Sequence, residues 1–322
     1  MAIATGLALA SAGCPGPTVE ETPSSTSADP DRPYVVVVGS AQDGGVPHAG
    51  CDCSRCQSAR HDPARRRYVA SLAICLPGTS EIFLIDATPD VGEQLEMVRD
   101  LRSPPAGAVD RTPVDGVFLT HAHIGHYLGL AWFGYEVMHT RELPVYATKS
   151  VLSFLESNGP WDQLVRLGNI APVEIAPGNP VELGSGVSVT AIAVPHRDEY
   201  TDTVGFIVAG PDTRLLYVPD TDGWDGWAPP LTAVLDEIDV ALLDGTFFSA
   251  GELPGRDLSS IGHPLIVDTM DLLETEVAKG RPRVFFVHLN HSNPALEPES
   301  AEAKEIARRG FRVAREGRRL AL

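Results

Sequence analysis

The sequence predicts a layered α/β fold, and three observations lead to this expectation. Short β-branched and aromatic segments recur along the chain from Tyr34 onward. Segments with helical periodicity separate several of them. Five apolar segments carry a polar residue at or just beyond their C-terminal end, where α/β proteins assemble their sites. Many strands with helices spread among them favour stacked α/β layers over an all-β sandwich.

The expected strands share a β-branched or aromatic composition and are bounded by turn residues. In chain order they are Tyr34–Val38, Glu81–Asp86, Gly116–Thr120, Pro144–Thr148, Val187–Val194, Thr203–Ala209, Arg214–Val218, Asp239–Asp244 and Arg283–His288. The spacing of apolar side chains predicts helices at Asp90–Arg102, Tyr127–His139, Lys149–Asn158, Val267–Lys279 and Glu297–Arg309. No internal repeat is visible in the sequence. We therefore expect one folded domain over residues 33–322.

Composition and charge set limits on the class of protein. Hydrophobic residues make up 43% of the 322 residues, which is enough to bury a large core. The formal net charge of −18 repels polyanions at long range and excludes a large nucleic-acid footprint. A small phosphorylated substrate held on a metal ion is compatible with this charge. No apolar run approaches the roughly 18 residues that a membrane-spanning helix needs.

Residues 1–32 are expected to form a segment outside the fold. An apolar run of small residues ends at Cys14, and a stretch rich in proline, serine, threonine and acids follows it, which cannot build a core. This order resembles a bacterial lipoprotein signal with Cys14 as the lipid anchor, which implies an exported, membrane-tethered protein. No basic residue precedes Cys14, and Ser11 stands where leucine is usual, so the pattern departs from the norm. The alternative is a disordered tail.

Ionisable residues at strand ends indicate where a site would form. They are Asp86, His121, Asp220, Asp244 and His288. Each alone is compatible with a simple turn residue. Because the C-terminal ends of neighbouring parallel strands meet at one edge of a sheet, five such residues together predict a site at that edge.

Three histidines follow the spacing His-x-His-x-x-His and indicate a metal site. His121 and His123 face the same side of an extended loop, and His126 opens the next expected helix. Further candidate ligands downstream are His196, Asp220 and His288. Imidazoles with a carboxylate suit Zn²⁺, although iron and manganese fit too.

This order of residues resembles the metallo-β-lactamase superfamily, from Tyr34 to the C-terminus. The resemblance implies a four-layer αββα sandwich with its site at one sheet edge. It further implies a first metal held by His121, His123 and His196, and a second held by His126 and His288, with Asp220 bridging and Asp86 orienting the motif loop. The family's remaining ligand to the second metal is an aspartate, and at its place this chain has Gly125.

Three cysteines with the spacing Cys-x-Cys-x-x-Cys predict a second, structural zinc site. Cys51, Cys53 and Cys56 lie too close together to pair comfortably with one another, whereas Cys₃His is a common closed zinc site. The arrangement resembles that in the phosphodiesterase of the carbon–phosphorus lyase pathway, which implies His291 as the fourth ligand. The opening loop and the last third of the chain also resemble the pyrroloquinoline-quinone (PQQ) biosynthesis protein B group. Typical members of that group have degraded His-x-His motifs, so the chain is expected to be a relative whose role in quinone biosynthesis stays open.

These features predict a metal-dependent hydrolase of small phosphodiesters or similar esters, with zinc as the expected metal. A bound metal acidifies water toward a pKa of about 7. His263 matches in chain order the histidine that relatives use near the leaving group, and a solvent-exposed loop histidine is its alternative reading. Two other functions stay open: an iron-dependent oxidative step on a quinone precursor, and a non-catalytic metal-bound module.

Asp43 is the candidate for the ligand that is missing at position 125. It lies on the glycine-flanked loop that leads from the first strand toward Cys51. Because Gly125 has no side chain, another residue can enter the vacated space, and Gly44 and Gly45 let the backbone turn sharply. The sequence therefore predicts that the Asp43 carboxylate approaches the second metal. The alternative is that Asp43 forms an Asp-Gly turn and that one metal is firmly bound.

Overall fold

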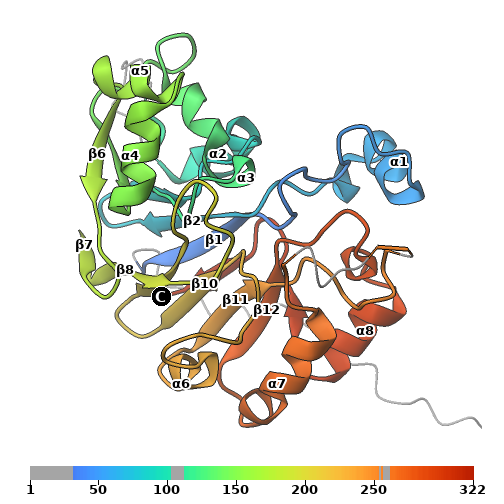
Figure 1. The fold of residues 1–322 in the computed structure, drawn as a ribbon. Helices are drawn as coiled ribbons and strands as arrows, with labels where there is room; N and C mark the ends of the chain where they lie inside the picture. Colours follow the sequence, from blue (N-terminus) through green and yellow to red (C-terminus); the bar gives the residue numbers. More distant parts are fainter. Residues whose placement is uncertain (1–31, 103–111, 254, 257–261) are drawn as a thin grey trace, which may run out of the picture. The chain divides into compact units, whose positions relative to one another are not determined.

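Two seven-stranded sheets lie face to face, and helices cover the outer face of each (Figure 1). The computed structural model describes residues 32–102, 112–253, 255–256 and 262–322. The expected segment 1–32 and its Cys14 lie outside the described residues except for Arg32. The expected four-layer αββα sandwich is confirmed. Among the described residues, no helix is long and apolar enough to cross a bilayer.

The first sheet has the strand order β14-β1-β2-β3-β4-β5-β6. Its strands are β1 (Tyr34–Gly39), β2 (Ser71–Leu76), β3 (Glu81–Ile85), β4 (Gly116–Phe118), β5 (Leu143–Ala147), β6 (Ile170–Glu174) and β14 (Arg319–Ala321). Strands β3 to β6 run parallel, so their C-terminal ends meet at one edge. Asp86 and the histidine motif follow two of these ends.

The second sheet has the order β13-β12-β11-β10-β9-β8-β7. Its strands are β7 (Pro180–Gly184), β8 (Val187–Ala193), β9 (Val204–Ala209), β10 (Arg214–Val218), β11 (Val240–Asp244), β12 (Arg283–Val287) and β13 (Arg312–Val313). Strands β10 to β13 are parallel, and Asp220, Asp244 and His288 lie at or just beyond three of their C-terminal ends.

The core consists of three buried hydrophobic layers. The central layer lies between the sheets and is built from alternate residues of both, such as Val35 and Val37 from one and Tyr217 and Phe285 from the other. The two outer layers lie between each sheet and its helices. The alternation of β-strand side chains between two faces explains why both faces of these strands must be apolar.

The helices divide between the two outer faces. The first sheet is covered by α2 (Val91–Val98), α3 (Ile124–Tyr127), α4 (Lys149–Ser157) and α5 (Trp161–Arg166). The second is covered by α6 (Leu231–Leu235), α7 (Ile266–Ala278) and α8 (Ala301–Arg308), while α1 (Ser54–His61) follows the cysteine loop. The side chains of Thr148 and Ser300 cap α4 and α8 by accepting from Val151 N–H and Ala303 N–H. The Ser300 cap explains why α8 begins later than the expected Glu297.

The prediction of a continuous helix at Tyr127–His139 was wrong. The chain instead forms the short α3, a 3₁₀ helix over Leu128–Phe133 and a turn. Gly129 lies so close to the loop after β3 that a Cβ there would be 2.0 Å from the Thr88 carbonyl oxygen. That close approach, followed by Gly134, overrides the apolar periodicity.

The sequence analysis also missed several elements, and four of them show the reasons. Strand β2 is buried along its whole length and so lacks polar alternation. Strands β6 and β7 each contain a proline, which lowers their strand signal. Helix α1 has no apolar stripe to mark it.

Candidate metal centre

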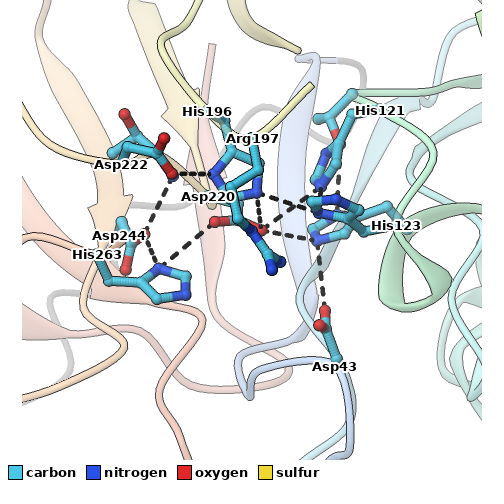
Figure 2. A network of polar contacts seen from close by, with 12 residues as sticks. Asp43, His121, His123, His196, Arg197, Asp220, Asp222, Asp244 and His263 are labelled. Atoms are coloured by element: carbon cyan, nitrogen blue, oxygen red, sulfur yellow. Dashed lines mark hydrogen bonds and ion pairs between the residues drawn. The ribbon is translucent and has the colours of Figure 1, made fainter. Parts of the chain in front are cut away.

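The predicted ligands meet at one edge of the sandwich, where both sheets end (Figure 2). His121 and His123 follow β4, and His126 lies in α3. From the second sheet come His196 after β8, Asp220 after β10 and His288 after β12. The sequence prediction of a site at the strand ends therefore matches where the structure places these residues.

Four donor atoms form the first ligand set. His123 Nδ1 lies 2.9 Å from His121 Nε2 and 3.1 Å from His196 Nε2. Asp220 Oδ2 lies 3.5 Å from His121 Nε2 and 3.2 Å from His196 Nε2. A metal about 2.1 Å from each of four tetrahedral ligands separates them by roughly 3.4 Å, so these residues fit a zinc-sized ion.

The other ring nitrogens of these histidines have fixed partners. His121 Nδ1 lies 2.9 Å from Thr120 Oγ1, and His196 Nδ1 lies 2.8 Å from Asp222 Oδ1. Such outer contacts fix which nitrogen faces the metal. The ligating edges of both rings therefore point into the site before any ion is bound.

Hydrogen bonds to Asp86 hold the loop that carries the histidine motif. Its carboxylate accepts from the Thr120 N–H at 2.8 Å and lies 2.7 Å from His126 Nδ1. Asp86 and His288 also adopt left-handed backbone conformations, with φ of 68° and 64°. Such conformations are strained for residues with a side chain, and they aim both groups at the sheet edge.

A second set of donor atoms faces a common point beside the first. Asp43 Oδ1 lies 3.6 Å from both His126 Nε2 and His288 Nε2. Asp220 Oδ2 lies 3.7 Å and 4.0 Å from the same two nitrogens and so joins the two sets. His288 is fixed by Thr246, whose Oγ1 lies 2.9 Å from its Nδ1.

Burial and charge set the protonation of this cluster. Burial holds the pKa of His121 well below its usual value. Burial alone would raise the pKa of Asp220, but the surrounding histidines hold it well below the usual range. Burial also opposes a charge on His126, yet the nearby carboxylates, Asp86 foremost, raise its pKa to about 9. Asp220 is therefore an anion ready to neutralise a cation.

His263 belongs to the site, so its alternative reading as a solvent-exposed loop residue was wrong. Its side chain is 5% exposed, and its Nδ1 lies 2.8 Å from Asp244 Oδ2 and 3.4 Å from Asp220 Oδ1. Burial opposes its charged form, but Asp244 and Asp220 raise its pKa to about 9. Asp244 in turn accepts from Thr246 Oγ1 at 2.7 Å.

The cysteines and His291 form a separate group. The Sγ atoms of Cys51, Cys53 and Cys56 lie 3.5, 3.9 and 3.7 Å from His291 Nδ1. With Zn–S of about 2.3 Å and Zn–N of about 2.0 Å, a tetrahedral site would give separations of roughly 3.5 Å. The four donors therefore fit the predicted structural zinc. The fourth described cysteine, Cys75, lies apart in β2.

Sequence reasoning missed the hydroxyl and carboxylate groups that hold the ligands in place. Thr120 and Thr246 contact histidine rings, and Asp222 and Glu199 contact His196 and His123. Both threonines stand within two residues of a strand-end ligand or carboxylate, which is the signal that could have found them. Asp244 was noted as a strand-end residue but not included among the ligands or catalytic groups.

Comparisons with known proteins agree with this geometry. Residues 82–289 match the Beta-lactamase superfamily domain. "Coenzyme PQQ synthesis protein B" of Methylobacterium radiotolerans is 28% identical over 89% of this chain and 99% of its own. The protein of the same name from Cupriavidus taiwanensis is 29% identical over 89% of this chain and 98% of its own length.

Solved structures resemble the fold as well. Zn²⁺-bound PqqB from Methylobacterium extorquens superposes with a TM-score of 0.75 at 26% identity, over 90% of this chain and all of that one. A diphosphatase of the PhnP family has a TM-score of 0.62 at 22% identity, over 90% of this chain and 97% of its own, and shows the shared fold. The domain match, the sandwich and the strand-end histidines establish that this chain belongs to the metallo-β-lactamase superfamily.

Proposed function

We propose that the protein is a metal-dependent hydrolase of small phosphodiester or ester substrates. The observation that carries the proposal is that Asp220 Oδ2 faces two neighbouring sets of donor atoms at the sheet edge. Three of their atoms, Asp43 Oδ1, His126 Nε2 and His288 Nε2, are buried without a hydrogen-bond partner. Buried polar atoms without partners are costly, and a bound cation would satisfy all of them.

Each residue has a defined role in this reaction. When bound, the metal ions supply an acidified water molecule and polarise the ester oxygen. The water oxygen forms a bond to the phosphorus or acyl carbon, and the bond to the leaving oxygen breaks. The proton that the water loses passes to solvent, because the surrounding histidines hold the pKa of Asp220 too low for it to keep the proton. His263, held at Nδ1 by Asp244, gives a proton from Nε2 to the leaving alkoxide and regains one from solvent.

A cavity beside the first ligand set supports a compact substrate with an apolar part. It encloses about 410 Å³ and reaches Asp43 and His123. Its aromatic wall consists of Tyr127, Phe154, Trp161 and Tyr200, and Arg197 contributes a cation. Aromatic walls favour flat apolar groups, and a guanidinium favours an anion such as phosphate. We infer an anionic ester with an aromatic or other flat apolar substituent.

A substrate panel tests this function. Zinc-loaded protein should hydrolyse aryl phosphodiesters faster than alkyl phosphodiesters of equal charge, and chelation should abolish turnover. Tyr200→Ala should raise KM for the aryl substrate more than for the alkyl one. Absence of hydrolysis across phosphodiesters, lactones and β-lactams by protein with a full metal complement would contradict the proposal.

A second candidate function is an iron-dependent oxidative step on a quinone precursor. Two observations favour it: His126, His288 and Asp43 form a set of two histidines and one carboxylate, and the relatives above are named for PQQ synthesis. Metal analysis of protein purified without added metal separates the two functions. Iron at the sheet edge with substrate-dependent oxygen uptake supports the oxidative step, and zinc supports hydrolysis.

A further inference from the structure

We propose that Asp43, on the loop after β1, is the ligand that replaces the missing carboxylate of the histidine motif at the second metal. The proposal rests on the metal sites of the proposed function but not on its hydrolytic step. In this proposal two segments, the loop after β1 and the histidine motif, both supply ligands to the second metal.

The side chain of Asp43 and any side chain at position 125 exclude each other. A Cβ placed on Gly125 would lie 2.0 Å from Asp43 Oδ1 and 2.7 Å from its Cγ. Both separations are shorter than any real contact of such atoms. The Asp43 carboxylate therefore fills the space into which an aspartate at position 125 would extend, so the two positions supply one carboxylate between them.

The direction of the Asp43 carboxylate points to a bound cation. Its Oδ1 lies 3.6 Å from His126 Nε2 and from His288 Nε2, which is too long for a hydrogen bond. All three atoms are buried and have no hydrogen-bond partner. A metal about 2.1 Å from each ligand would separate tetrahedral donors by roughly 3.4 Å, close to the observed values. One ion at this point would satisfy three atoms that otherwise carry the cost of unpaired burial.

Charge neutralisation gives the substitution its physical reason. Without Asp43, the second ion would have two neutral imidazoles and only a share of Asp220, which also faces the first ion. A dication held mainly by neutral groups is poorly neutralised. The Asp43 carboxylate returns to the site the negative charge that Gly125 removes. The compensation is local, because both groups reach the same point.

Backbone hydrogen bonds hold the Asp43 loop against the strand end that carries His288. Gln42 N–H donates to the Leu289 carbonyl at 3.0 Å, and Leu289 N–H donates to the Ser40 carbonyl at 3.0 Å. Gly45 closes the turn with φ of 61°, and its N–H donates to the Gln42 carbonyl at 2.8 Å. This N–H is therefore taken by the backbone, and the Asp43 carboxylate is free to face the histidines, as Figure 2 shows.

The same loop continues to the cysteine site. A Cβ on Gly44 would lie 2.1 Å from His48 Nδ1, so only glycine allows His48 its place there. The His48 ring stacks on His291 with 4.5 Å between ring centroids. The loop that carries Asp43 is thus attached at one end to the sheet edge and at the other to a ligand of the structural zinc.

The test counts metal ions in the full-length protein and does not depend on a substrate. Metal is removed from the sheet edge with a chelator and returned as Zn²⁺, with Co²⁺ absorption as a second readout. Asp43→Ala should bind one ion fewer per chain than the wild type while melting as a folded protein. Asp43→Asn keeps the shape of the side chain without its charge. It should lower the affinity for the second ion by about tenfold to a hundredfold. The control is Asp52→Ala, which removes an exposed carboxylate from the same loop and should keep the wild-type count.

The reciprocal swap sharpens the test. Gly125→Asp alone should disturb the second ion, because its side chain collides with Asp43. Asp43→Gly combined with Gly125→Asp should regain the full ion count, since the carboxylate returns from the other segment. A folded Asp43→Ala protein with the wild-type ion count and affinity would overturn the proposal, as would a folded double variant that stays one ion short. Loss of hydrolysis with unchanged ion binding bears only on the proposed function.

Discussion

The two candidate metal sites of this chain differ in how their ligands are held. The ligands of the sheet-edge site come from both sheets, and most of their outer atoms contact fixed partners such as Asp86, Thr120 and Thr246. Three of the four cysteine-site ligands come from one short segment, the loop before α1 and the first turn of that helix, and His291 from the loop after β12 is the fourth. Cys53 is exposed and Cys51 only partly buried. The fold preorganises the first site, whereas the second needs its ion to hold the loop.

The comparison predicts that replacing a sheet-edge ligand lowers the rate of hydrolysis strongly but changes the stability of the fold only slightly. Asp220→Asn should lower hydrolysis about a thousandfold or more, because it removes the carboxylate shared by both ligand sets. The melting temperature in chelator should change by only a few degrees. The matched control is Asp222→Asn, which alters an outer contact of His196 and should cost about tenfold. Equal losses in the two variants would contradict the shared role of Asp220.

The cysteine site should show the reverse pattern. Cys53→Ser should lower zinc content by one ion and destabilise the domain by about 4 kcal/mol, equivalent to a melting temperature lower by roughly 10 °C. Calorimetry and metal analysis measure both effects. Cys75→Ala is the control, because it removes a buried thiol that lies outside the site and should leave the zinc content unchanged. Unchanged zinc in Cys53→Ser would show that these thiols hold no metal.

His263 sharpens the comparison because it serves the sheet-edge chemistry without being one of the expected ligands. His263→Gln should lower hydrolysis of a poor leaving group about a hundredfold while the ion count stays constant. An aryl ester with an acidic leaving group needs less protonation, so its rate should fall much less. The control is His61→Gln, on the exposed end of α1, which should match the wild type. Equal rate losses for both substrates would assign His263 a role other than proton donation.

The smallest effect is expected from the N-terminal segment. We propose that Cys14 carries a lipid. A protein that starts at Arg32 should keep its melting temperature, ion count and activity, while full-length native protein partitions into detergent. Cys14→Ser should abolish the partitioning. Recovery of native protein from the soluble fraction with an unmodified Met1 would contradict this proposal.

The sequence by itself identified the family and indicated the candidate ligands. His-x-His-x-x-His and Cys-x-Cys-x-x-Cys are local spacings, and a β-strand or extended loop places such neighbours on one side through its own geometry. The strand-end placement of Asp86, Asp220 and His288 could be predicted because each follows a strongly apolar run. These features depend on short stretches of chain, so they can be recognised in the sequence without knowledge of the fold.

Only the tertiary structure decided what lies between those stretches. Asp43 and Gly125 are far apart in the sequence, and they share one space because backbone hydrogen bonds attach the β1 loop to Leu289 at the end of β12. The burial of His263 between Asp220 and Asp244 likewise depends on β10 and β11 ending side by side. The broken helix after Tyr127 follows from the close approach of Gly129 to Thr88. In each case the deciding energy is a long-range contact or exclusion, and such terms leave no periodic signal in the segments that make them.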